Sequence, residues 1–275
     1  MDKQPFRVTR YPHGTFSWTD LGSRDAAASK PFLTELMGWA AVDIPTGEAD
    51  HEVYTMFSLD GENVAALSPH SPEMMEQGYP SFWSSYITVD DVDAMVPRIE
   101  ELGGQINFAP FDVFDSGRML VLTDPVGASV CLWQPRSHIG ASLVNCPGAM
   151  AWNELNTPDS EASQAFYGAL FGWEFVPAGP PGYMMIRNQG RSNGGILPMD
   201  ETWRQPDGSL VPSHWSVYFS VADLDRALEN VKALGGELIH DMMQASGVGR
   251  FHVVRDPAGS YFTLIQLDQP EPWSE

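Results

Sequence analysis

The chain contains little cysteine and no long apolar run. Only two cysteines, Cys131 and Cys146, occur in 275 residues, which is too few for a disulfide framework and favours reduced, intracellular thiols. No stretch approaches the roughly 18 apolar residues of a membrane span. Residues 1–16 also lack the apolar segment of a signal peptide. We therefore expect a cytoplasmic protein that has no membrane partner.

Positive charge is scarce as well. Lysine and arginine number 15 against 36 acidic residues, which gives a formal net charge of −21. Such a field repels nucleic acid and anionic membrane surfaces, so neither is an expected partner. The charge is typical of a well-solvated protein and carries no information on the fold. We expect a small-molecule ligand as partner, and the chain as a monomer or a homodimer.

The composition that is present is that of a globular protein containing an internal repeat. Hydrophobic residues make up 43% and aromatic residues 11%. Residues 83–104 match residues 215–236 without a gap, with nine identities in 22 positions. Trp18 and Trp152 belong to a second matching set, whose offset is 134 instead of 132. The chain is therefore a tandem duplication.

The repeat divides the chain into five parts. They are an N-terminal arm, a first domain, a linker, a second domain and a C-terminal tail, at residues 1–13, 14–135, 136–147, 148–268 and 269–275. The linker is not rich in glycine or serine, which predicts that the two domains pack together.

Each copy contains the same strand–helix–strands pattern twice. In the second copy, an alternating strand precedes a helix start at Asp159, and the pattern restarts before Asp223. This predicts an α+β fold of four βαβββ units in two domains. Pro31 and Pro97 fall inside helix patterns of the first copy. Because proline removes a backbone donor, we expect these two helices to start late or bend.

Three short motifs carry a resemblance to a known family. They are F-Y-x-x-L-F-G-W at 166–173, V-x-D-x-D at 89–93 and 221–225, and D-P-x-G at 124–127 and 256–259. In this order and twice over, the chain resembles the vicinal oxygen chelate superfamily, which contains glyoxalase I, bleomycin resistance proteins and extradiol dioxygenases. More closely, it is similar to two-domain glyoxalase-like proteins of actinobacteria, often described as hydroxylases, which include a mycobacterial culture-filtrate antigen.

The resemblance implies two cup-shaped glyoxalase-like domains, each with a small-molecule site inside its sheet. Enzymes of the family hold a divalent metal there through His, Gln or Glu side chains, and the metal serves as Lewis acid and template. The resemblance places these ligand positions in the two domains at Trp18, Ser84, Cys131 and, loosely, Ala66, and at Trp152, Ser216, Thr263 and Gly195. None of these residues is His, Gln, Asp or Glu. We therefore expect no metal and no other cofactor; an error of register would leave a metal possible.

Strand alternation predicts what lines the cups instead. Asp20 and Glu154 follow the two tryptophans on the same face, and an arginine is expected near each rim. The predicted ligand-binding residues are Trp18, Ser84, Tyr86, Arg118, Trp133, Trp152, Ser216, Tyr218 and Arg250. Aromatic walls with few polar groups suit a small apolar or aromatic ligand.

Asp20 and Glu154 are the candidates for acid–base catalysis. If the tryptophans remove water from these carboxyls, their pKa values rise and they can exchange protons near neutral pH. The alternative is a structural ion pair with Arg118 or Arg250. The tryptophans themselves have a second interpretation, as core residues that fill a collapsed cup.

Three functions remain open on the sequence. The first is a metal-independent protein that binds a small molecule. The second is an enzyme, either a glyoxalase-type lyase or isomerase or a hydroxylase or dioxygenase-type oxidoreductase. The third is a structural or host-interaction role, which only the antigen-like relative suggests. The sequence names no ligand and does not decide whether one cup or both are used.

Overall fold

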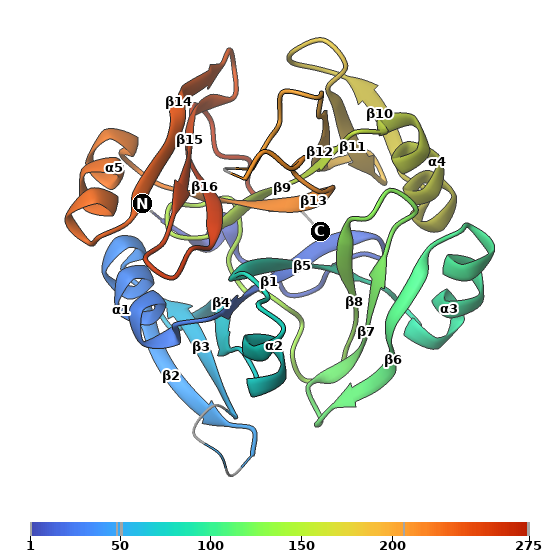
Figure 1. The fold of residues 1–275 in the computed structure, drawn as a ribbon, viewed down its shortest axis with the longest axis horizontal. Helices are drawn as coiled ribbons and strands as arrows, with labels where there is room; N and C mark the ends of the chain where they lie inside the picture. Colours follow the sequence, from blue (N-terminus) through green and yellow to red (C-terminus); the bar gives the residue numbers. More distant parts are fainter. Residues whose placement is uncertain (1, 48, 50–51, 206, 274–275) are drawn as a thin grey trace.

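The strands assemble into two open sheets of eight, one from each half of the chain. The structure is a computed structural model that describes residues 2–47, 49, 52–205 and 207–273. Within these residues the sheets have the orders β2-β3-β4-β1-β5-β8-β7-β6 and β10-β11-β12-β9-β13-β16-β15-β14. Neither sheet closes into a barrel. Figure 1 shows β1 and β5 beside β9 and β13 in the middle of the molecule.

The first domain follows a 3-10 turn, η1 (Gln4–Phe6). Its elements are β1 (Thr15–Ser23), α1 (Ala26–Met37), β2 (Ala40–Pro45), β3 (Val53–Leu59), β4 (Glu62–Pro69), α2 (Pro72–Glu76), β5 (Phe82–Thr88), α3 (Val92–Glu101), β6 (Gln105–Val113), β7 (Gly117–Thr123) and β8 (Ser129–Pro135).

The second domain repeats this order, and the structure assigns no counterpart of α2 among its described residues. Its elements are β9 (Met150–Thr157), α4 (Ser160–Phe171), β10 (Glu174–Pro177), β11 (Met184–Asn188), β12 (Arg191–Pro198), β13 (His214–Ser220), α5 (Leu224–Ala233), β14 (Glu237–Ala245), β15 (Gly249–Arg255) and β16 (Tyr261–Leu267).

Each sheet is built from two βαβββ units. Within a unit the first and last strands pair in parallel, as β1 with β4 and β5 with β8. The two units join through their first strands, which pair antiparallel as β1 with β5 and β9 with β13. The α+β class and the four βαβββ units predicted from the sequence are thereby confirmed.

Equivalent helices begin on an aspartate in every unit. The side chains of Asp25 and Asp159 each accept a hydrogen bond from a backbone N–H three residues on, in the way of an N-cap. The first helices of the two domains end at Gly38 and Gly172, whose φ angles of 70° and 72° lie in the left-handed region. Local capping thus sets the same helix length in both copies.

We expected the two proline-containing helices of the first domain to start late or bend, and the expected late start is wrong. Helix α1 contains Pro31 and spans 12 residues, as α4 does without proline. Helix α3 contains Pro97 and spans ten residues, as α5 does. The aspartate caps fix the starts, and the N–H that each proline lacks lies beyond the first turn.

The domains share two hydrophobic cores instead of having one each. One core joins Phe32 and Leu33 of α1 to Val231 of α5, and the other joins Ile99 of α3 to Phe166 of α4. Helix α1 contacts α5, and α3 contacts α4. Figure 1 shows these helix pairs on opposite sides of the molecule. The prediction of packed domains is therefore confirmed.

No helix among the described residues is long and apolar enough to span a membrane.

Candidate functional site

A buried carboxyl surrounded by tyrosine hydroxyls lies on the concave face of the first sheet. Asp20 of β1 accepts hydrogen bonds at Oδ2 from the hydroxyl of Tyr86, at 2.7 Å, and from that of Tyr54, at 3.0 Å. The Tyr54 hydroxyl in turn accepts a hydrogen bond of 3.0 Å from Nε1 of Trp18. These four residues form a continuous chain of indole, phenol, carboxyl and phenol.

The second cup contains the same chain of groups. The Tyr218 hydroxyl donates to Oε1 of Glu154 at 2.7 Å. Nε1 of Trp152 donates to the Tyr183 hydroxyl at 3.1 Å, and that hydroxyl also bonds to Glu154. We call these two clusters the carboxyl–tyrosine clusters.

Strand register places these side chains together. On the paired strands β1 and β5, Asp20 lies opposite Ser84 and Trp18 lies opposite Tyr86. Because alternate residues share a face, all four side chains lie on the concave side. The second sheet has the same register for Glu154 with Ser216 and Trp152 with Tyr218. The predicted facing of the two carboxyls is confirmed by their hydrogen bonds to tyrosines of the neighbouring strands.

Burial raises the pKa of both carboxyls. Loss of solvent is the main cause for Asp20, and hydrogen bonds from Tyr86, Tyr54 and Ser84 lower the pKa only in part. For Glu154, burial again outweighs the bonds from its two tyrosines. Burial also raises the pKa of Tyr86, so this hydroxyl keeps its proton and remains a donor. Each cluster therefore holds an acid that stays protonated to a higher pH than an exposed carboxyl.

The side chains at the family's metal positions are a poor donor set for a divalent ion. In the first cup, Nε1 of Trp18 carries a proton that is donated to Tyr54. Burial raises the pKa of the Cys131 thiol, which favours the neutral form. Ser84 supplies a neutral hydroxyl, and Ala66 supplies no donor.

The second cup also lacks side chains suited to binding a divalent ion at these positions. Its equivalent positions are Trp152, Ser216, Thr263 and Gly195. Among the described residues, no group of three or more His, Cys, Asp or Glu side chains is arranged to hold a metal ion. The residues at these positions do not fit the metal that the family implies.

Trp133 closes one end of the first cup together with the linker. Its Nε1 donates to the carbonyl of His138 at 2.9 Å. The His138 ring packs edge-on against Trp18, with ring centroids 4.7 Å apart. Burial lowers the pKa of His138 to about 4, so this ring is neutral at pH 7. Trp18 is 3% exposed, whereas Trp152 of the second cup is only partly buried.

The structure does not bring the two predicted rim arginines to the carboxyls. Arg118 pairs with Asp93 of α3 and with Asp112 of β6. It alternates along β7 with Met119, which packs in the core that contains Trp18, so Arg118 lies on the helix side. Arg250 pairs with Asp225 of α5 at 3.0 Å. The proposed ion pairs between these arginines and the cup carboxyls are not formed.

Two members of the clusters were missed from the sequence, Tyr54 and Tyr183. Both lie near the start of the third strand of a unit, and pairing with β4 and β12 makes them equivalent at an offset of 129. The repeat was detectable at offsets of 134 and 132, so a comparison in either register does not align these tyrosines. Strand alternation in residues 53–59 is the signal that could have found Tyr54.

A row of further polar side chains continues beyond Glu154 in the second cup. Nδ2 of Asn156 donates to Oγ of Ser216 at 2.9 Å and lies 3.4 Å from Nε2 of His214. Asn156 and His214 lie opposite each other on β9 and β13. Burial lowers the pKa of His214, which keeps the ring neutral at pH 7.

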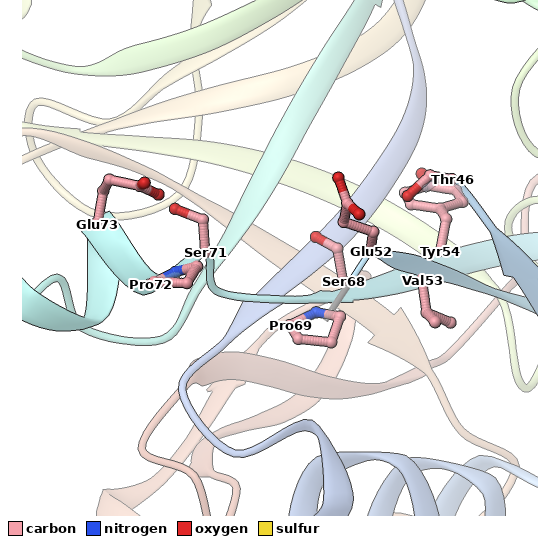
Figure 2. A pocket seen from close by; sticks show the side chains of 9 residues that line it. All are labelled: Thr46, Glu52, Val53, Tyr54, Ser68, Pro69, Ser71, Pro72 and Glu73. Carbon is pink, nitrogen blue, oxygen red and sulfur yellow. The ribbon is translucent and has the colours of Figure 1, made fainter. Parts of the chain in front are cut away.

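A pocket of about 560 Å³ opens beside the first cup, between the ends of β3 and β4 and helix α2. Figure 2 shows the side chains of Glu52 and Ser68 on one side of these strands and those of Val53 and Pro69 on the other. Tyr54 also lines the pocket. Solvent therefore reaches the first carboxyl–tyrosine cluster from the Tyr54 side.

Comparison with known protein families gives one match in each domain. The Glyoxalase/Bleomycin resistance protein/Dioxygenase superfamily matches residues 15–132, and a Glyoxalase-like domain matches residues 152–265. The candidate glyoxylase CFP32 of Mycobacterium tuberculosis is 40% identical over 262 residues, which cover 94% of this chain and 97% of that protein. An anthracycline biosynthesis protein of Streptomyces peucetius is 33% identical over 275 residues, covering 96% and 98%.

Solved structures show the same fold at low identity. The Mn(II)-bound glyoxalase of Novosphingobium aromaticivorans has a TM-score of 0.63 and 17% identity, and the match covers 96% of this chain and 86% of that one. The 2,3-dioxygenase LapB of Pseudomonas sp. KL28 has a TM-score of 0.62 and 11% identity, covering 96% and 97%.

Proposed function

The chain belongs to the glyoxalase/bleomycin resistance protein/dioxygenase superfamily, and we propose that it binds a small, apolar or aromatic molecule in its cups without a divalent metal. One observation carries the proposal. Both cups keep a carboxyl–tyrosine cluster, built on Asp20 and on Glu154, next to the positions at which the resemblance places the family's metal ligands.

The clusters have the chemistry of a site for a neutral, planar ligand. The indoles and phenols offer apolar faces, and aromatic contacts add to the free energy of burying such a ligand. The phenols donate their protons to the carboxyl. A protonated carboxyl is itself a donor, so a carbonyl or ether oxygen is the group that it would bind. An anionic ligand is disfavoured by the net charge of −21.

Binding is proposed to be independent of metal because of the donors present. Trp18 and Ser84 are neutral, and the proton on the Trp18 indole nitrogen points to Tyr54. A divalent cation would also need the carboxyl in its charged form, which burial opposes at Asp20.

Thermal unfolding with and without chelator tests the proposal. A planar aromatic probe such as 2-naphthol should raise the melting temperature, and excess EDTA should leave that shift unchanged. A probe at a hundredfold its Kd stabilises the folded state by about 2.7 kcal/mol, which is readily measured. Failure of 2-naphthol and of a broad panel of aromatic molecules to shift melting would overturn the proposal. Stoichiometric tightly bound metal in untagged protein would overturn its metal-free part.

A second function, catalysis on a small metabolite, is favoured by the raised pKa of Glu154 and of Asp20. Such a carboxyl keeps its proton to a higher pH than an exposed one and can donate it to a substrate, as a glyoxalase-type lyase or isomerase, or a hydroxylase, would require. The names of the relatives, a candidate glyoxylase and an anthracycline biosynthesis protein, point in the same direction.

Replacing Glu154 with Gln separates binding from catalysis. The amide keeps the shape of the carboxyl and can still donate a hydrogen bond, but it does not transfer protons. In a binding protein, Glu154→Gln and the matched Asp20→Asn should retain most of the affinity for the probe. In an enzyme, turnover of the substrate should fall by 10²-fold or more while binding persists.

A further inference from the structure

The polar row of the second cup has a defined hydrogen-bonding direction. Nδ1 of His214 lies 2.8 Å from the carbonyl oxygen of Pro212. A carbonyl only accepts, so Nδ1 carries the proton, and Nε2 of the neutral ring carries a lone pair. That lone pair faces Nδ2 of Asn156 at 3.4 Å, a long contact that a better donor can replace.

The row continues the second carboxyl–tyrosine cluster along the same face. Asn156 follows Glu154 by two residues on β9, and His214 precedes Ser216 by two residues on β13. Two residues of a strand span about 7 Å, so the backbone positions of Asn156 and Glu154 are about that far apart along β9. His214 and Ser216 are only partly buried, which leaves them accessible to a ligand.

The first cup lacks this second polar group at the equivalent positions. Gly22 and Phe82 stand where the second cup has Asn156 and His214. The His70 ring packs on Phe82, with centroids 5.6 Å apart, and is in contact with Gly22. The two cups therefore share one polar cluster and differ beyond it: the second has Asn156 and the partly buried His214, and the first has the buried His70 ring on Gly22 and Phe82.

We infer that His214 and Asn156 form a hydroxyl-binding subsite in the second cup, with His214 Nε2 as the acceptor for a ligand O–H. The ligand class is a small aromatic molecule with a hydroxyl at one end and a carbonyl at the other, the carbonyl being bound by the Glu154 cluster. The inference rests on the proposed function, since it specifies the ligand of one of the two cups.

The test compares 4-hydroxybenzaldehyde with benzaldehyde, which lacks the hydroxyl. Both are titrated against the full-length protein and the His214→Phe and His214→Gln variants, with circular dichroism to confirm folding. Phenylalanine reproduces the first cup and removes the acceptor, whereas the Gln amide oxygen keeps one. His214→Phe should weaken binding of 4-hydroxybenzaldehyde about tenfold and leave benzaldehyde unchanged, because one hydrogen bond is lost. His214→Gln should retain most of the affinity for 4-hydroxybenzaldehyde.

The results that would overturn this inference differ from those that would overturn the proposed function. Equal weakening of both aldehydes in His214→Phe would show a structural role and overturn the inference, as would equal affinity of the unaltered protein for both. In either case the cup still binds an aromatic aldehyde. If neither aldehyde binds, the inference fails; whether the proposed function fails with it is decided by the separate melting experiment with 2-naphthol and the aromatic panel.

Discussion

The indole nitrogen of Trp173 donates a 2.8 Å hydrogen bond to the carbonyl of Gly14, which lies at the start of the other domain. Trp39, its equivalent at an offset of 134, donates to the carbonyl of Gly148 at 2.7 Å, and Gly148 is the equivalent of Gly14. Each domain thus donates the same hydrogen bond to the other domain. This symmetric pair of bonds fixes the end of each domain's first helix to the start of the opposite domain.

Replacing Trp173 with Phe should lower the free energy of unfolding by about 2 kcal/mol, because a buried carbonyl loses its donor and part of the indole volume is lost. The matched variant Trp39→Phe should have a comparable effect, since both indoles are 4% exposed. Urea denaturation measures both. Stability unchanged in the two variants would mean that the exchanged contacts do not hold the domains together.

The repeat made most of the fold predictable from the sequence. Asp159 and Asp223 mark helix starts in the second copy, and they cap α4 and α5 in the structure. The sequence did not show which element packs against the buried face of each helix. Phe32 and Phe166 show the same spacing as any buried helix residue, but they pack in two cores that each combine both domains. Pairing between distant units leaves no local pattern.

The site was predictable where strand alternation alone decides it. Asp20 and Tyr86 were placed on the concave face by counting, and they bond to each other. Arg118 was misplaced to the cup rim, because the alternation of a strand does not tell which face a helix covers. Tyr54 was missed because its distance from Asp20 in the sequence depends on hairpin lengths that differ between the copies.

The carboxyl clusters predict a specific pH dependence of stability. Asp20 and Glu154 have folded-state pKa values raised above their ordinary 3.8 and 4.5. Between the ordinary and the raised value the folded state binds more protons than the unfolded state, so stability falls as pH rises through this window. The slope is at most about 1.4 kcal/mol per pH unit for each carboxyl.

Replacing both carboxyls by amides isolates this contribution. The double variant Asp20→Asn/Glu154→Gln should lack the decline in stability from about pH 4 upward that these two carboxyls are expected to contribute. Urea unfolding at a series of pH values measures the difference between the two proteins, in which the other ionisable groups cancel. If the free energies of unfolding of the two proteins change with pH in parallel, neither carboxyl has a different pKa in the folded and unfolded states.

Removing Arg118 should leave ligand binding intact. Its guanidinium pairs with Asp93 and Asp112 on the helix side of β7 and not with Asp20. We expect Arg118→Gln to bind 2-naphthol as the unaltered protein does, measured by fluorescence titration, and the matched Arg250→Gln to do the same. A clear loss of affinity in either variant would return the arginine to the ligand site.

Gly195 is the position where the smallest change should disable one cup alone. The Tyr183 hydroxyl lies so close over Gly195 that a Cβ there would collide with it. Gly195→Ala should therefore displace Tyr183, take a donor from Glu154 and raise the pKa of that carboxyl further. The overpacking should lower the free energy of unfolding by about 1–3 kcal/mol.

The first cup supplies the control for this change, because Ala66 already stands at the equivalent position, paired with Asp20 as Gly195 is paired with Glu154. Ala66→Gly should leave the Tyr54 hydrogen bond to Asp20 in place and reduce stability only slightly. Titration with 4-hydroxybenzaldehyde should show weaker binding in Gly195→Ala and unchanged binding in Ala66→Gly, because the ligand depends on the Tyr183–Glu154 side of the second cup. If Gly195→Ala binds the aldehyde as tightly as the unaltered protein, the second carboxyl–tyrosine cluster does not contact the ligand.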